Sequence, residues 1–272
     1  MKRLRNIEMQ LSYRGSAYFG WQIQPDVPTV QGVLQGILRR TLNAPGLRTI
    51  GASRTDTGVH AHDQRVGFQM THQIPLGGLM RTLNHRLPPD IRVHSIRERE
   101  EAFSVRYHAS GKHYTYFWDN RSFSEPFFTD YMCSLSKSLD HEAMNALCRH
   151  LIGTHCFKSF QASRDARVSS QTTIFSARVG RSGNLVFFDV VGHHFLYHMV
   201  RNMATSLLRV GTGEWQAPEW LDRLRAGDRK LMCKTAPAHG LHLFEVFYQE
   251  GPLTYSERSA PFRDLLTASI AS

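Results

Sequence analysis

Hydrophobic and polar residues alternate in some stretches of the chain and follow helical spacing in others. Near the start, polar residues separate four apolar positions, a period-two pattern that predicts a β-strand with one buried face: Ile7, Met9, Leu11 and Tyr13. After Pro28-Thr29, six apolar residues share one helical stripe: Val30, Val33, Leu34, Ile37, Leu38 and Leu42. A strand followed by a covering helix is therefore expected at the start of the chain.

Three more elements are predicted before residue 100. Alternation at residues 66–70 predicts a second strand, and leucines at helical spacing follow at 76–87 until Pro88-Pro89 stops the pattern. Ile91 and Val93 begin a third strand. The first part of the chain is thus predicted to run strand, helix, strand, helix, strand.

The rest of the chain continues the alternation of strands and helices. Further strands are predicted at residues 112–118, 173–179, 185–191 and 242–248. Three helices are predicted: from the N-cap Asp140 to Leu151 before Gly153, from Phe195 to Val210 before Gly211, and a short one after Pro218.

The connections between strands favour one fold class. Arg181-Ser-Gly-Asn184 is typical of a hairpin turn, and hairpins join antiparallel strands. We therefore expect an α+β protein rather than a doubly wound parallel sheet. A charged run at residues 98–102 separates an N-terminal α+β subdomain (1–102) from a C-terminal one (103–250), with a polar tail at 251–272.

Composition and charge narrow the range of partners. The 272 residues hold 33 Lys and Arg against 23 Asp and Glu, giving a net charge of +10 and a pI near 9.8. This excess suits a polyanion such as RNA or DNA, although charge spread along a chain also promotes solubility. No apolar run has the length of a signal peptide or a membrane span, so a soluble, cytoplasmic protein is expected.

Cysteine and histidine spacing does not predict a metal centre. The four cysteines, at 133, 148, 156 and 233, form no C-x-x-C pair and are expected to be reduced. His194 and His198 lie four apart on a predicted helix, but Phe195 stands where H-E-x-x-H has its glutamate. The group formed by Cys148, His150, His155 and Cys156 matches no standard zinc spacing.

The segment from Gly51 to Ala61 has the most chemical content, because small residues and glycines surround Arg54 and Asp56. Side chains two apart on an extended backbone project to one side, so these two pair or converge on a ligand. A guanidinium there keeps the carboxylate ionised, as a nucleophile requires. Gly58 permits a positive φ that turns the loop.

Two other interpretations of this segment remain open at this point. An Asp-x-Gly surface turn with an incidental salt bridge has the same spacing. Asp56-Thr-Gly58 is also the tripeptide of aspartic proteases, in which two carboxylates share one proton. The chain has one copy, and Arg54 would disturb a shared proton, which argues against the protease.

Arg54-Thr-Asp-Thr-Gly-Val-His60 resembles the signature of the tRNA pseudouridine synthase A family. Other blocks that resemble the family follow its order: Tyr13–Gln22 with Thr29–Gln31, Phe103–Ala109 with Lys112–Tyr116, Gly153–Phe157, Met199–Asn202 with Val210–Gly213, and Ala236–Leu241. The resemblance extends from about residue 5 to residue 248. Six ordered blocks over nearly the whole chain make a chance match implausible.

The resemblance implies a fold, a reaction and a partner. It implies the pseudouridine synthase fold, with two similar subdomains that each contain an antiparallel sheet flanked by helices. It also implies a homodimer that isomerises uridine 38, 39 and 40 in the anticodon stem-loop of tRNA. Because this isomerisation involves no redox change, we expect no cofactor, and the ligand spacing predicts no metal. The same chemistry on another RNA, or an RNA-binding module that has lost turnover, are the alternatives.

The resemblance also implies roles for four residues. Asp56 corresponds to the invariant aspartate and Arg54 to the active-site arginine, while Tyr114 corresponds to the ring that contacts the target uracil and Arg201 to a supporting arginine. A flipped-out base needs an aromatic face in place of its stacking partners, which suits Tyr114. A charge within an apolar helix needs a partner, so we expect Arg201 either to pair with Asp56 or to reach the surface.

Other cations and several departures from the family pattern complete the sequence evidence. Lys112, Arg106 and Arg65 are candidate phosphate ligands or simply solvated charges. The chain departs from the usual family residues at three places: Cys156 instead of Asp, Thr172 instead of Arg, and Ala204-Thr205 where a glycine is usual. None of these departures touches Arg54, Asp56 or Tyr114, although they weaken the expectation that all three uridines are modified.

Overall fold

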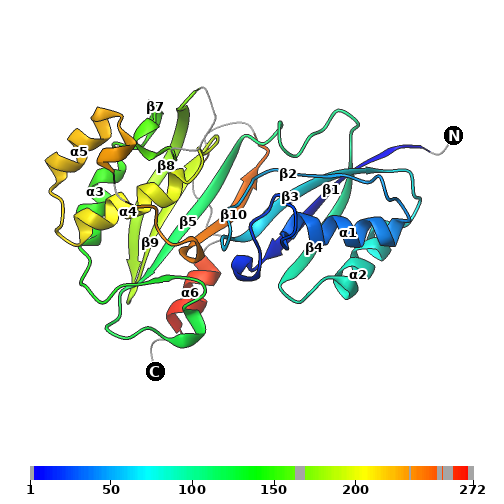
Figure 1. Cartoon of the computed structure of the whole chain (residues 1–272), viewed down its shortest axis with the longest axis horizontal. Helices are drawn as coiled ribbons and strands as arrows, with labels where there is room; N and C mark the ends of the chain where they lie inside the picture. The colour runs from blue at the N-terminus through cyan, green and yellow to red at the C-terminus, as the bar shows by residue number, and fades with distance from the viewer. Residues whose placement is uncertain (1–2, 163–168, 233, 250–252, 254–259, 269–272) are drawn as a thin grey trace. The chain divides into compact units, whose positions relative to one another are not determined.

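The computed structural model describes residues 3–162, 169–232, 234–249, 253 and 260–268. The chain divides into two compact units, residues 1–110 and 111–272 (Figure 1). Each unit consists of an antiparallel sheet with helices packed against it, which confirms the predicted α+β class.

Unit 1 has the predicted order of strands and helices, with one additional short strand. Its elements are β1 (Arg5–Tyr13), α1 (Val30–Leu42), β2 (Thr49–Gly51), β3 (His60–Met70), α2 (Leu76–Arg86) and β4 (Ile91–Arg99), with a short 3-10 turn at Gly15–Ala17. β1 lies between β3 and β4, and β2 pairs with residues 66–68 of β3. All these pairs are antiparallel.

The buried face of the unit 1 sheet is the one predicted from alternation. Ile7, Met9, Leu11 and Tyr13 of β1 are all buried. Five of the six residues of the predicted apolar stripe of α1 are buried as well, and Val33 is partly exposed. The helix starts where the sequence predicts, because the Thr29 hydroxyl accepts the Gly32 N–H at 3.2 Å and caps the first turn.

The other face of this sheet carries a buried carboxylate surrounded by arginines. Glu8 of β1 is 1% exposed and accepts hydrogen bonds from Arg65 at 3.0 Å, Arg97 at 2.7 Å and Arg99 at 2.6 Å. Burial by itself raises the pKa of Glu8, but the hydrogen bonds and charges of Arg97 and Arg99 outweigh it, so the pKa is below its usual value. Glu8 therefore remains ionised and joins β1 to both neighbouring strands.

Unit 2 is built around a central five-stranded antiparallel sheet in the order β10-β5-β9-β8-β7. Its strands are β5 (Gly111–Asp119), β6 (Cys133–Ser134), β7 (Gly153–Cys156), β8 (Gln171–Ser182), β9 (Leu185–Gly192) and β10 (Leu241–Phe247). The short β6 adds to β5 in parallel. The predicted hairpin joins β8 to β9, with Gly183 at φ +57 in a two-residue turn.

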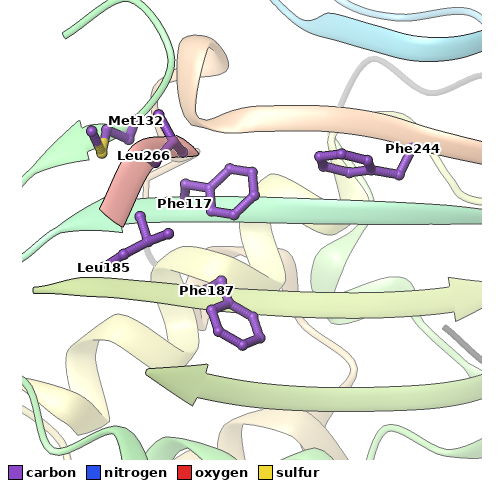
Figure 2. Packing of buried hydrophobic residues seen from close by; sticks show 6 residues of the cluster. All are labelled: Phe117, Met132, Leu185, Phe187, Phe244 and Leu266. Atoms are coloured by element: carbon purple, nitrogen blue, oxygen red, sulfur yellow. The ribbon is translucent and has the colours of Figure 1, made fainter. Parts of the chain in front are cut away.

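Four α-helices of unit 2 are described: α3 (His141–Cys148), α4 (Met199–Gly211), α5 (Ala217–Ala226) and α6 (Ala260–Ala268). Short 3-10 turns lie at Pro126–Phe128, Lys158–Phe160, Arg229–Leu231 and Ala238–Gly240. α6 supplies Leu266 to a buried cluster with Phe117 of β5, Leu185 and Phe187 of β9, Phe244 of β10 and Met132 (Figure 2). The C-terminal helix is thus part of the core of unit 2.

Three predictions about the helices differ from the structure. The helix from Asp140 ends at Cys148 instead of Leu151, and Gly153 begins β7 instead of ending a helix. The helix predicted from Phe195 begins at Met199, because His198 has a left-handed backbone with φ +62. α6 occupies part of the predicted polar tail. None of the described helices is long and apolar enough to cross a membrane.

Candidate active site

Asp56 lies on the loop between β2 and β3, and hydrogen bonds fix the loop at both ends. The Ala52 N–H donates to the Arg65 carbonyl at 2.8 Å, and the Val59 N–H donates to the Asp56 carbonyl at 3.1 Å. Gly58 makes the turn with φ +82, as predicted. Asp56 is half-buried and Arg54 is exposed.

Thr55, between the two charged residues, ties the loop to unit 1. Its hydroxyl lies 2.7 Å from the Tyr13 hydroxyl of β1, and its carbonyl accepts the Trp21 N–H at 3.1 Å. Thr55 is buried whereas its two neighbours are not, which is the exposure pattern of an extended segment with residues 54 and 56 on the same side. An ion pair between Arg54 and Asp56 remains a prediction.

The segment before α1 packs directly against this loop. The Gly15 N–H donates to His60 Nδ1 at 3.1 Å. Gly20 has φ +83, and a Cβ on it would lie 2.8 Å from the Thr55 carbonyl oxygen and 3.2 Å from the Asp56 carbonyl carbon. Trp21 stacks on Tyr13 with 6.0 Å between ring centroids. This first block therefore supports the backbone of the Asp56 loop, a role that the sequence analysis did not identify.

Two side chains of β3 act next to the loop. The Gln64 side chain bonds to the Ser53 backbone as a neighbouring strand would. Its Nε2 donates to the Ser53 carbonyl at 2.9 Å, and its Oε1 accepts the Ser53 N–H at 3.2 Å. Burial, followed by the charges of His60 and His94, lowers the pKa of His62 to about 3. His62 is therefore a neutral imidazole at neutral pH.

Arg65, a candidate phosphate ligand in the sequence, is held by carboxylates. Its Nε and Nη2 donate to the two oxygens of Asp63 at 2.5 Å and 3.1 Å, and its Nη1 donates to Glu8 at 3.0 Å. An arginine with these donors engaged inside the unit stabilises the sheet. Of the other two candidates, Arg106 is exposed and Lys112 is half-buried.

Tyr114 and Arg201, the other two predicted site residues, lie in unit 2. Tyr114 of β5 is 6% exposed, and the Phe195 ring meets it edge-on with 5.2 Å between centroids. Arg201 of α4 is half-buried, and its Nε donates to the Ala236 carbonyl at 2.8 Å. Its predicted pairing with Asp56 remains a prediction.

The block at residues 236–241 packs around Arg201 and Tyr116. The Tyr116 hydroxyl donates to the Pro237 carbonyl at 2.9 Å, and a Cβ at Gly240 would lie 2.6 Å from the Tyr116 ring. Only glycine leaves room for that ring. Burial, with Cys133 close by, raises the pKa of Tyr116, so this phenol stays protonated.

Among the residues that the structure describes, the histidine and cysteine groups noted in the sequence do not converge on a metal site. His194 and His198 do not share a helix, since α4 begins after both of them. Within the described ranges, no three His, Cys, Asp or Glu side chains are grouped so as to hold a metal ion. Cys133, Cys148 and Cys156 are free thiols, and burial raises the pKa of Cys148 to about 12. Cys233 lies outside the described residues.

Comparison with known proteins gives three findings. A family model described as tRNA pseudouridine synthase matches residues 10–108 and 147–249. A protein of Francisella tularensis subsp. novicida named tRNA pseudouridine synthase A is 36% identical over 248 residues, 91% of this chain and 95% of that protein. A protein of the same name from a Thermoanaerobacter species is 36% identical over 245 residues, 90% of this chain and 100% of that protein.

A solved Cbf5-Nop10-Gar1 complex aligns with a TM-score of 0.31 and 11% identity, over 74% of this chain and 54% of that chain. A TM-score this low does not by itself identify a shared fold.

The matched segments in both units and the two named relatives define the class of protein as an RNA-modifying isomerase. The match to the family model includes the Asp56 loop and Arg201, whereas β5, which carries Tyr114, lies between the two matched segments. The chain belongs to the tRNA pseudouridine synthase family.

Proposed function

We propose that this enzyme converts uridine to pseudouridine at positions 38, 39 and 40 of the tRNA anticodon stem-loop, with the Asp56 carboxylate as nucleophile and without a cofactor. The observation that carries the proposal is the fixed, partly exposed Asp56 loop. Backbone hydrogen bonds from Trp21 and Val59 and the buried Thr55 hydroxyl hold its main chain. A nucleophile on a preorganised loop needs little rearrangement before it reacts.

The chemistry of isomerisation is the reason that no cofactor is proposed. The C1'–N1 glycosidic bond breaks, the uracil turns, and a C1'–C5 bond forms, while C5 loses a proton and N1 gains one. No electrons are gained or lost overall, so no redox partner is required. The carboxylate of Asp56 attacks either uracil C6 or ribose C1'. Both alternatives require the ionised form.

The remaining site residues are proposed to hold the substrate. The ring of Tyr114 replaces the stacking that the target base loses when it leaves the helix. Arg54, exposed beside Asp56, and Arg201, on α4, supply positive charge for the carboxylate and for the RNA backbone. Action as a homodimer in the cytoplasm is part of the same proposal and comes from the family resemblance.

Replacement of Asp56 by asparagine tests the nucleophile. Wild type, Asp56→Asn and a control, Asp222→Asn, are incubated with an unmodified tRNA transcript carrying uridine at 38–40. Asp222 lies on α5 and its side chain is 78% exposed, so the same chemical change there should leave turnover unchanged. Removal of a nucleophile is expected to lower the rate by at least about 10³-fold.

Pseudouridine is mapped by carbodiimide-dependent primer extension, and tRNA affinity is measured in parallel. Product from wild type and from the control only, with similar affinity for all three proteins, supports the proposal. Pseudouridine at other positions would indicate that the enzyme acts on a target other than the anticodon arm. Tight binding without product from wild type would favour an RNA-binding module, and an active Asp56→Asn variant would exclude Asp56 as nucleophile.

A further inference from the structure

A buried cluster of charged and polar groups lies on the α6 face of the unit 2 sheet. Asp189 of β9 is completely buried, and one of its oxygens lies 2.6 Å from the Thr115 hydroxyl and 3.0 Å from His113 Nε2. Its other oxygen accepts Arg178 Nε at 3.1 Å and Arg263 Nη1 at 3.3 Å. Without partners of this kind, a carboxylate in the interior would be strongly destabilising.

This cluster includes both neighbours of Tyr114 on strand β5 and lies on the opposite face of the sheet from the Tyr114 ring. Thr115 is the cross-strand partner of Asp189, and Tyr114 is the partner of Val190. Side chains alternate along a strand, so His113 and Thr115 point to the α6 face while Tyr114 between them points to the other face. Asp189 therefore holds β5 on both sides of the residue proposed to contact the uracil.

Arg263 reaches the cluster from a part of the chain that the family model does not match. The matched segments end at residue 249, and α6 begins at Ala260. The Thermoanaerobacter relative is covered over its whole length by 245 residues of alignment, whereas this chain has 272. α6 therefore lies beyond the segments that the family model matches.

The contacts of α6 show that the Arg263 side chain packs against the sheet. Arg263 is 8% exposed, and its guanidinium lies over the Phe187 ring at 4.6 Å from the centroid. Leu266, one turn further along the helix, packs close to Phe117 (Figure 2). A cation fixed in this way has lost its side-chain freedom in the folded state and can act as a rigid partner for Asp189.

We propose that Arg263 is a positioning residue for Tyr114, acting through Asp189 and the β5 backbone. When its charge is removed, the fully buried carboxylate keeps Arg178, His113 and Thr115 as partners. These partners must shift to compensate, and two of them flank Tyr114. The inference rests on the proposed function of Tyr114 and adds a contribution of α6 to the same site.

Three variants test this inference in the full-length protein. Arg263→Met keeps an apolar stem over Phe187 but removes the charge, and Arg263→Lys restores a cation. Leu265→Ala is the control, because Leu265 lies on the same helix and is 58% exposed. Thermal unfolding of each variant establishes that it is folded at the assay temperature.

Turnover and tRNA affinity are then measured separately. A small displacement of a positioned group affects chemistry more than binding, so Arg263→Met is expected to lower kcat by about 10- to 100-fold with tRNA affinity within about twofold of wild type. Arg263→Lys is expected to recover most of kcat, and Leu265→Ala to match wild type. Unchanged kcat in a folded Arg263→Met variant would overturn the inference, as would a lysine variant no better than methionine.

A double-mutant cycle separates positioning of Tyr114 from a general structural effect. Single-turnover rates with enzyme in excess are compared for Tyr114→Ala, which removes the ring proposed to contact the uracil, for Arg263→Met and for the double variant. If Arg263 acts through Tyr114, the two losses are not additive, and additive losses would contradict the inference. Wild-type turnover is measured in the same series. If the wild-type protein forms no pseudouridine, the proposed function itself is refuted. If the wild-type protein is active and the Arg263→Met variant is equally active, only the role of α6 is refuted.

Discussion

Replacement of Gly20 by alanine changes the support of the Asp56 loop without touching a proposed catalytic side chain. Gly20 has φ +83, and its Cα faces the backbone of the loop. The added Cβ would lie 2.8 Å from the Thr55 carbonyl oxygen and 3.2 Å from both the Asp56 carbonyl carbon and the Thr57 nitrogen. All three neighbours are backbone atoms, so no flexible side chain can move aside.

Two effects of different size follow from this geometry. A left-handed backbone costs a non-glycine residue about 1–2 kcal/mol, which lowers the free energy of unfolding. Ordinary contact begins near 3.4 Å, so the Thr55 carbonyl must also move by about 0.6 Å (3.4 − 2.8). Because displacement of a reacting group by 1 Å costs roughly 100-fold in rate, we expect kcat to fall by about tenfold or more.

Gly213 provides a matched control for the strain alone. It has φ +74, and a Cβ there would meet nothing within 4 Å. Gly213→Ala should therefore lose a similar 1–2 kcal/mol, seen by urea unfolding, while turnover of tRNA stays at the wild-type rate. If Gly20→Ala is as active as Gly213→Ala at equal folded fraction, the contact between the first block and the Asp56 loop does not position the nucleophile.

Two further predictions concern stability. Glu8→Gln should lower the free energy of unfolding at pH 7 by about 2 kcal/mol, because charge-assisted hydrogen bonds to Arg97 and Arg99 are lost. The folded-state pKa of Glu8 lies below its unfolded value of 4.5, so this contribution is complete above pH 4.5 and disappears as the pH falls through the folded pKa. Urea unfolding of both proteins at pH 7 and at decreasing pH measures it, and a pH-independent difference would contradict the assignment. Asp140→Ala should cost about 1 kcal/mol, because the Asp140 carboxylate caps α3 by accepting the Ala143 N–H at 2.9 Å, and Asp140→Asn should retain most of it; equal losses in a urea titration would argue against capping.

The order of elements was predictable because burial and periodicity coincide in most of the chain. α1 begins where Thr29 caps it and ends near its last apolar residue, Leu42. The ends of α3 and α4 were not predictable in this way, because Leu151 and Leu196 are buried although they lie outside the helices. An apolar pattern reports burial, whereas a helix end is set by backbone hydrogen bonds and by residues such as His198 at φ +62.

α6 was missed for a different physical reason. The sequence after residue 251 is mostly polar, and the helix is placed by tertiary contacts, among them those of Phe262 and Leu266 with the core and that of Arg263 with Asp189. Arginine on a short helix is ordinarily a surface residue. Arg263 has a partner in the interior, a buried aspartate 74 positions earlier, and no local pattern contains that information.

The residues that support the Asp56 loop show why a family signature extends beyond the residues that take part in the chemistry. Arg54 and Asp56 are conspicuous by charge and spacing, but Gly20 and Trp21 act on the loop through backbone atoms more than thirty positions away. The departures from the family pattern lie elsewhere, in unit 2. Thr172, where the family usually has arginine, is buried and donates its hydroxyl to the His194 carbonyl at 2.7 Å. Such a hydrogen bond stabilises packing within unit 2, so Thr172 has a structural role there and lies apart in the sequence from the loop that carries the Asp56 carboxylate.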